Sequence, residues 1–199
     1  SDLGLSIQVD RIGNVIGTRA GILDSPPVMI GSHIDSVATG GLYDGALGVL
    51  AGLEAIQTLN EADLKTQYPI AVGFFTNEEG VRFTPDMMGS AVHQGSLSLE
   101  TALETVGTDG QTVGAELTRI GYAGDTPVKN MTPRAYLEFH IEQGPVLENT
   151  NTTIGAVTGV QGISWTEFEL QGVSNHAGTT PMHLRHDAGY VAAAIAVEA

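Results

Sequence analysis

Four short polar clusters hold the side chains of this 199-residue chain that are best suited to chemistry. Each combines histidine or carboxylate groups and lies at the end of an apolar run or beside a glycine. They are His33-Ile-Asp35, Tyr43-Asp44-Gly45, Asn77-Glu78-Glu79-Gly80 and His140-Ile-Glu-Gln143. In a chain without cysteine, imidazole nitrogen and carboxylate oxygen are the strong metal ligands that remain. The clusters therefore indicate a site for divalent cations.

The acidic groups favour a pair of ions. Two metals about 3.5–4 Å apart share a carboxylate, and Asp44, which has glycines on both sides, is the candidate for that bridge. Glu78 and Glu79 point in different directions at a strand end, so we expect one to bind metal and the other to move a proton. A metal-bound water deprotonated by that free glutamate would be a hydrolytic nucleophile. Asp35 is placed to accept the second ring proton of His33 and to fix the ring.

Each of these residues also has an ordinary structural interpretation. A histidine at a strand end is often a hydrogen-bonded surface residue, and two adjacent glutamates are usually solvated. Asp44 is a suitable N-cap for the helix that follows it. The four clusters together favour the metal site over these separate interpretations.

Apolar periodicity predicts the elements that position the clusters. Short apolar runs predict strands at residues 5–9, 14–18, 27–32, 70–76 and 135–141. Residues 44–59 form a pattern typical of a buried crossover helix, and residues 113–120 predict a shorter helix. The order of these elements predicts an α/β fold, a sheet with helices on both faces. Ligands of such sheets gather at the carboxyl ends of the strands, where three of the clusters lie.

The pattern changes after Glu148. Residues 153–160 and 164–170 predict two further strands, and a helix is expected from about Asp187. These few elements cannot bury their own apolar faces. We therefore expect residues 1–160 to be the N-terminal part of a metal-binding catalytic domain, and residues 161–199 to be the start of an α+β lid or dimerisation domain.

Composition restricts the partners. The 42% of apolar residues suffice for a sizeable core and exclude global disorder. The formal net charge is -15, and the eight basic residues form no strip that could follow phosphates, so we expect no nucleic-acid partner. The same lack of basic charge, and the shortness of the apolar runs, argue against a membrane. The absence of cysteine is compatible with a reducing compartment, and we expect a cytoplasmic location.

Five motifs together resemble the amidase/hydantoinase/carbamoylase branch of the M20 metallopeptidase family. They are Gly31-Ser-His-Ile-Asp-Ser36, Gly40-Gly-Leu-Tyr-Asp-Gly45, Glu78-Glu-Gly-Val-Arg-Phe83, His140-Ile-Glu-Gln-Gly-Pro145 and Asn175-His-Ala-Gly-Thr-Thr-Pro-Met182. The resemblance runs in order from near residue 5 to the end of the chain. It implies a zinc-peptidase-like catalytic domain and hydrolysis of the carbamoyl or ureido C–N bond of N-carbamoyl-L-amino acids.

The resemblance also implies roles for individual residues. Its metal ligands are His33, Asp44, Glu79 and His140, with Asp44 bridging two ions and Glu79 on the second one. Glu78 corresponds to the general base and Gln143 to a substrate contact. His176 resembles the lid histidine that binds substrate and stabilises the oxyanion, commonly across a dimer interface. The expected cofactors are two divalent ions, zinc or manganese, with cobalt or nickel as further possibilities.

Other interpretations of the resemblance stay open. The substrate could be allantoate, ureidoglycolate or β-ureidopropionate, and the enzyme could be an aminoacylase or peptidase of the same family. A non-catalytic dimerisation module is the remaining interpretation. The family's members are roughly twice as long and supply a further histidine for the second metal, with a lid asparagine and arginine. We therefore expect this chain to be an inactive fragment of a homodimer that pairs through its lid domain.

Overall fold

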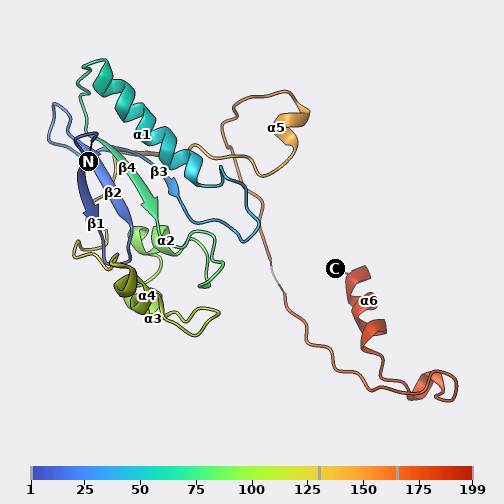
Figure 1. Ribbon diagram of the computed structural model, residues 1–199. Coiled ribbons are helices and arrows are strands. Elements are labelled where there is room, and N and C mark those ends of the chain that lie inside the picture. Colours follow the sequence, from blue (N-terminus) through green and yellow to red (C-terminus); the bar gives the residue numbers. More distant parts are fainter. Residues whose placement is uncertain (1, 130, 165, 199) are drawn as a thin grey trace. The chain divides into compact units, whose positions relative to one another are not determined.

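One mixed sheet organises the first three quarters of the chain. The computed structural model describes residues 2–129, 131–164 and 166–198. The strands are β1 (Ser6–Val9), β2 (Val15–Arg19), β3 (Val28–His33), β4 (Ile70–Phe75) and β5 (Ala135–Leu137). They lie in the order β1-β2-β4-β3-β5, and Figure 1 labels the first four strands of the sequence. The strands β3, β4 and β5 are parallel, whereas β1 and β2 join antiparallel at the other side.

Helix α1 (Ala46–Glu61) packs on one face of this sheet, where Val49 and Ile56 join Val72 of β4 in a buried cluster. Gly48 makes a close approach possible, because a Cβ there would lie 2.6 Å from the carbonyl oxygen of Phe139 and 2.8 Å from Ser32 Cβ. The segment that leads into His140 can therefore lie directly against the start of α1.

The opposite face carries a second apolar cluster, which comprises Ile16, Met29, Ala71 and Phe75. Helix α2 (Met88–Gln94) reaches this face, since the His93 ring lies 5.8 Å from that of Phe75, centroid to centroid. Helices α2, α3 (Leu99–Glu104) and α4 (Val113–Ile120) share a further buried cluster with Ile12 and Phe83. The predicted α/β sheet with helices on both faces is thus confirmed.

Most predicted elements of this part lie close to their observed bounds. The first four strands agree to within one residue at each end, and the helix at residues 113–120 is confirmed. Strand β5 was predicted to reach residue 141 but ends at Leu137, because it pairs with β3 only from Ala135 to Leu137. Helices α2, α3 and α5 (Val146–Asn149) were not predicted, since segments of four to seven residues show too little periodicity.

The chain divides into two compact units between Asn151 and Thr152. The second contains a 3₁₀ turn, η1 (Met182–Leu184), and helix α6 (Ala188–Glu198). The strands predicted at residues 153–160 and 164–170 are wrong: the described residues there form no strand, and Trp165 lies outside them. An alternating segment becomes a strand only where a partner supplies hydrogen bonds. The division expected after residue 160 stays a prediction.

The helix expected from Asp187 is confirmed. The Oδ1 atom of Asp187 accepts hydrogen bonds from the main-chain N–H groups of Gly189 and Tyr190, at 2.9 and 3.1 Å. Among the helices of the described segments, none has the length and apolar character that crossing a bilayer demands.

Candidate metal centre

Three of the predicted metal ligands meet beyond the carboxyl ends of the parallel strands. His33 ends β3, Asp44 precedes α1, and His140 follows β5. One ligand atom from each lies within 4.8 Å of the others. His33 Nε2 is 3.3 Å from His140 Nε2, which in turn is 3.6 Å from Asp44 Oδ1. The structure thus brings together imidazoles and a carboxylate that are far apart in the sequence.

Main-chain carbonyls fix the orientation of both imidazoles. His33 Nδ1 lies 2.8 Å from the carbonyl oxygen of Asp35, and His140 Nδ1 lies 2.8 Å from that of Ile141. Because a carbonyl oxygen can only accept, each Nδ1 carries a proton, and both Nε2 atoms face the centre as potential ligands. Two imidazole nitrogens bound to one tetrahedral zinc, at about 2.05 Å each, lie about 3.3 Å apart. The observed separation therefore fits a shared ion.

Local backbone geometry directs Asp44 into the site. Gly45, with φ of 63°, is the N-cap of α1, and no side chain caps this helix. The interpretation of Asp44 as a helix cap is therefore wrong. A Cβ at Gly45 would overlap the His33 ring, so only glycine leaves room for that imidazole.

Glu79 borders the same centre. Its Oε1 atom lies 3.7 Å from His33 Nε2. Burial raises the pKa of Glu79, and a hydrogen bond to the Asp44 carboxyl raises it further. Two carboxylates this close repel each other when both are ionised, and a bound cation would reduce that repulsion. Asp44 and Glu79 can thus contribute to a second ion beside the first.

Asp35 connects the His33 strand end to the glutamate turn. Its carboxylate accepts hydrogen bonds from the main-chain N–H groups of Glu78, at 3.3 Å, and Glu79, at 3.0 Å. The same carboxylate is 3.6 Å from His33 Nδ1, farther than the residue's own carbonyl. Its proximity raises the pKa of His33 to about 9, against the lowering effect of burial. Asp35 therefore orients the predicted ligand chiefly through its main chain.

Glu78 points away from Glu79, as expected for neighbours at a strand end. Its two carboxylate oxygens accept hydrogen bonds from the main-chain N–H and the hydroxyl of Ser90 in α2, both at 2.9 Å. Burial raises the pKa of Glu78, which suits a group that takes up and returns a proton. Ser90 was missed by sequence reasoning because a lone serine after a methionine pair carries no recognisable motif.

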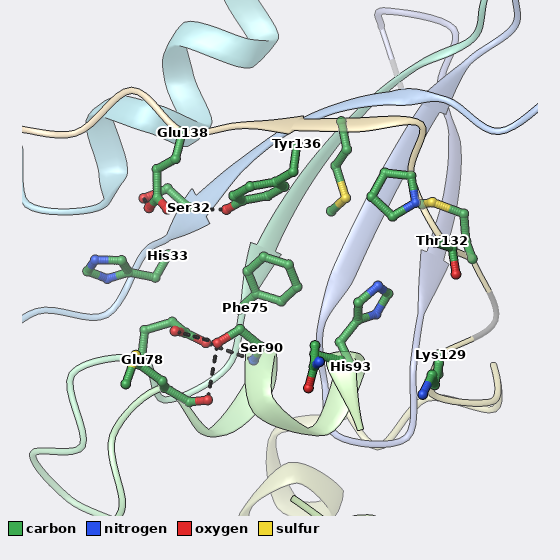
Figure 2. A pocket seen from close by; sticks show the side chains of 15 residues that line it. Ser32, His33, Phe75, Glu78, Ser90, His93, Lys129, Thr132, Tyr136 and Glu138 are labelled. Atoms are coloured by element: carbon green, nitrogen blue, oxygen red, sulfur yellow. Dashed lines mark hydrogen bonds between the residues drawn. The ribbon is translucent and has the colours of Figure 1, made fainter. Parts of the chain in front are cut away.

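Glu78 and His33 line a cavity of about 560 Å³, seen in Figure 2. Apolar side chains such as Phe75 also line it, and in this view Glu138 lies above and Glu78 below. Glu138 accepts hydrogen bonds from the hydroxyls of Ser32, at 2.7 Å, and Tyr136, at 3.3 Å. Sequence reasoning passed over Glu138, although it stands two positions before His140.

The two remaining predicted residues differ in their surroundings. Gln143 donates from Nε2 to Asp44 Oδ1 at 2.8 Å, so it contacts a candidate metal ligand directly. His176 belongs to the second compact unit, where it is exposed and its Nδ1 accepts from the main-chain N–H of Gly178 at 3.0 Å. Its action on substrate stays a prediction.

Comparison with known proteins identifies the family. The sequence model described as peptidase family M20/M25/M40 matches residues 29–199, which contain all four polar clusters. The chain belongs to this family. Membership implies dependence on divalent metal, and the His33, Asp44 and His140 group is a possible site for it.

Individual relatives match this chain over almost its whole length. The chain is 49% identical to an N-carbamoyl-L-amino-acid amidohydrolase of Rhizobium meliloti over 98% of its own length and 47% of that protein. It is 39% identical to a ureidoglycolate hydrolase of Arabidopsis thaliana over 98% of this chain and 43% of that protein. A hydantoinase/carbamoylase family amidase from Burkholderia ambifaria superposes with a TM-score of 0.79 at 44% identity, over 99% of this chain and 49% of that one. The chain thus spans about half the length of the curated relatives it matches.

Proposed function

We propose that the whole protein hydrolyses the carbamoyl C–N bond of N-carbamoyl-L-amino acids with the help of two divalent cations, zinc or manganese. The observation that carries this proposal is the pair of imidazoles whose Nε2 atoms face each other 3.3 Å apart beside Asp44. The named activity of the Rhizobium meliloti relative supports the choice of substrate. The cations, once bound, supply a Lewis acid for the carbamoyl oxygen and lower the pKa of water.

The protein's own groups supply the proton transfers. Glu78, held by Ser90, accepts a proton from the attacking water, and its raised pKa allows it to give that proton to the leaving nitrogen. His33 and His140 are held by carbonyls, so they keep their Nε2 atoms aimed at the centre. The addition of water yields the free amino acid, with ammonia and carbon dioxide from the carbamoyl group.

The family resemblance supports two further parts of the proposal. The motif Asn175-His-Ala-Gly supports His176 as the donor that stabilises the oxyanion, with Gln143 contacting substrate. The family resemblance also supports a homodimer formed through the segment 161–199. A small ureido substrate such as ureidoglycolate is the second candidate, favoured by the Arabidopsis thaliana relative.

The test is a comparison of substrates and metals on the whole protein. Metal is removed with a chelator, and zinc, manganese, cobalt or nickel is restored before ammonia release is measured from N-carbamoyl-L-amino acids, ureidoglycolate and allantoate. We expect release from N-carbamoyl-L-amino acids only after metal is restored. His140→Ala should abolish it, whereas His183→Ala, at an exposed histidine of η1, should not. Activity that persists without metal, or in His140→Ala, would refute the proposal.

A further inference from the structure

We propose that Gln143 is a positioning residue, which holds the Asp44 carboxylate in the orientation that binds metal. This inference rests on the proposed function and adds to the substrate contact that the family resemblance implies. It assigns Gln143 a measurable effect on metal affinity in the absence of any substrate.

The contact itself is the first support. Asp44 is only 3% exposed, and a buried carboxylate needs hydrogen-bond donors. Gln143 Nε2 donates to Asp44 Oδ1 at 2.8 Å, and no other N–H group of the described residues donates to this carboxylate. The same Oδ1 atom faces His140 Nε2. The hydrogen bond from Gln143 therefore leaves the other lone pair of Asp44 Oδ1 on the side that faces the imidazoles.

The backbone at Gln143 is the second support. Its φ of 55° lies in the left-handed region, which is uncommon for a residue other than glycine or asparagine. The preceding Glu142 holds this turn, because its carboxylate accepts from the main-chain N–H groups of Val146, at 3.1 Å, and Leu147, at 2.8 Å, at the start of α5. A costly conformation that neighbouring hydrogen bonds hold in place points to a placed side chain. Here that side chain reaches Asp44.

Two substitutions separate the amide from the backbone. Gln143→Met keeps a side chain of similar length and the same left-handed strain but removes the donor. Gln143→Gly removes the side chain and relieves the strain. Gln57→Ala is the matched control, since Gln57 also donates to a carboxylate, that of Glu61, at 2.8 Å, but on the exposed side of α1. All three are made in the whole protein.

Zinc affinity is measured by competition with a chromophoric chelator, without substrate. We expect both Gln143 variants to bind zinc about 10- to 100-fold more weakly, the range typical of a residue that orients a metal ligand. The control should match the unaltered protein. Thermal unfolding of Gln143→Met in excess chelator should stay cooperative but shift to a lower temperature, because the buried Asp44 carboxylate loses a hydrogen bond, so zinc affinity is still measured on folded protein.

Three outcomes would overturn the inference. Unchanged zinc affinity in both variants, with a raised KM, would leave Gln143 as a substrate contact only. Normal affinity in Gln143→Gly alone would show that the amide is not needed, and that the methionine side chain itself disturbs the centre in Gln143→Met. If the unaltered protein bound no zinc, manganese, cobalt or nickel, the proposed function would fail together with this inference, which distinguishes that result from the other two.

Discussion

Replacing Gly45 by alanine is a direct test of the geometry at the candidate metal centre. The residue combines a φ of 63° with close contact to the ring of His33. A Cβ at this position would lie less than 3.0 Å from three atoms of that ring, a separation that real Cβ atoms essentially never have. The imidazole would have to move, and its Nε2 would leave the position opposite His140.

The expected cost has two parts. Forcing a positive φ on alanine costs at least about 1–2 kcal/mol, and overpacking against a buried ring adds about 1–3 kcal/mol. We therefore expect the free energy of unfolding of Gly45→Ala to fall by about 2–5 kcal/mol. Displacing a ligand should also weaken zinc binding, by at least about 100-fold, the upper end of what displaced supporting residues cause.

Chemical unfolding in excess chelator measures the stability, and chelator competition measures zinc affinity. Gly121→Ala is the control, because Gly121 has a φ of 76° but no other group within 4 Å of the point where a Cβ would lie. It should lose stability through strain alone and keep its zinc affinity. If Gly45→Ala bound zinc as tightly as Gly121→Ala, the assignment of His33 to the centre would be wrong.

Three further predictions address the surroundings of the site. Ser90→Ala removes a hydrogen bond worth about 1.5 kcal/mol to the Glu78 carboxylate. The acid limb of the pH–rate profile of the whole protein should therefore move up by about one pH unit. If the limb did not move, Glu78 would not be the group whose protonation limits the rate. Asn14→Leu removes the side-chain amide that bonds the carbonyl of Gly89 and the main-chain N–H of Thr76, and leaves both groups unsatisfied. A denaturant titration should then show a free energy of unfolding lowered by about 2–4 kcal/mol. A loss below about 1 kcal/mol would contradict this prediction. Arg82→Gln should raise the pKa of Glu116 from about 2 towards its ordinary 4.5. The rise should be incomplete, because Arg119 still donates to Glu116. A carboxyl titration by NMR that shows no rise would refute the ion pair between Arg82 and Glu116. Because that pKa is lowered in the folded chain, the stabilisation from Glu116 is present above about pH 4.5 and lost as the pH falls through about 2.

The sheet and the ligand cluster were accessible from the sequence for a physical reason. Short apolar runs predict strands from the local sequence alone. Parallel strands place their carboxyl ends at one edge of the sheet, which brings His33 and Glu79 together. The contact of Gln143 with Asp44 was not accessible, because it joins residues 99 positions apart through an ordinary amide. The hydrogen bonds of Ser90 to Glu78 depend likewise on where α2 lies.

The predicted strands at residues 153–160 and 164–170 failed for a related reason. Alternation describes which face a side chain would occupy, but it does not provide the neighbouring strand that must accept and donate the hydrogen bonds. Residues 153–160, 164 and 166–170 carry the alternation, but no strand of the described residues lies beside them. By contrast, Asp187 makes its hydrogen bonds to the first turn of its own helix, so that start could be predicted.

Strand β5 is joined to the rest of the sheet through only three residue pairs, from Val28 with Ala135 to Ile30 with Leu137. His33 is the last residue of β3, whereas His140 comes shortly after β5, and the two histidines are 107 residues apart in the chain. An ion shared by both imidazoles would act as a cross-link that closes a long loop, and such closures reduce the entropy of the unfolded chain most. The edge strand and the cation site would then protect each other, so that chelation loosens the border of the sheet and fraying of that border releases the ion.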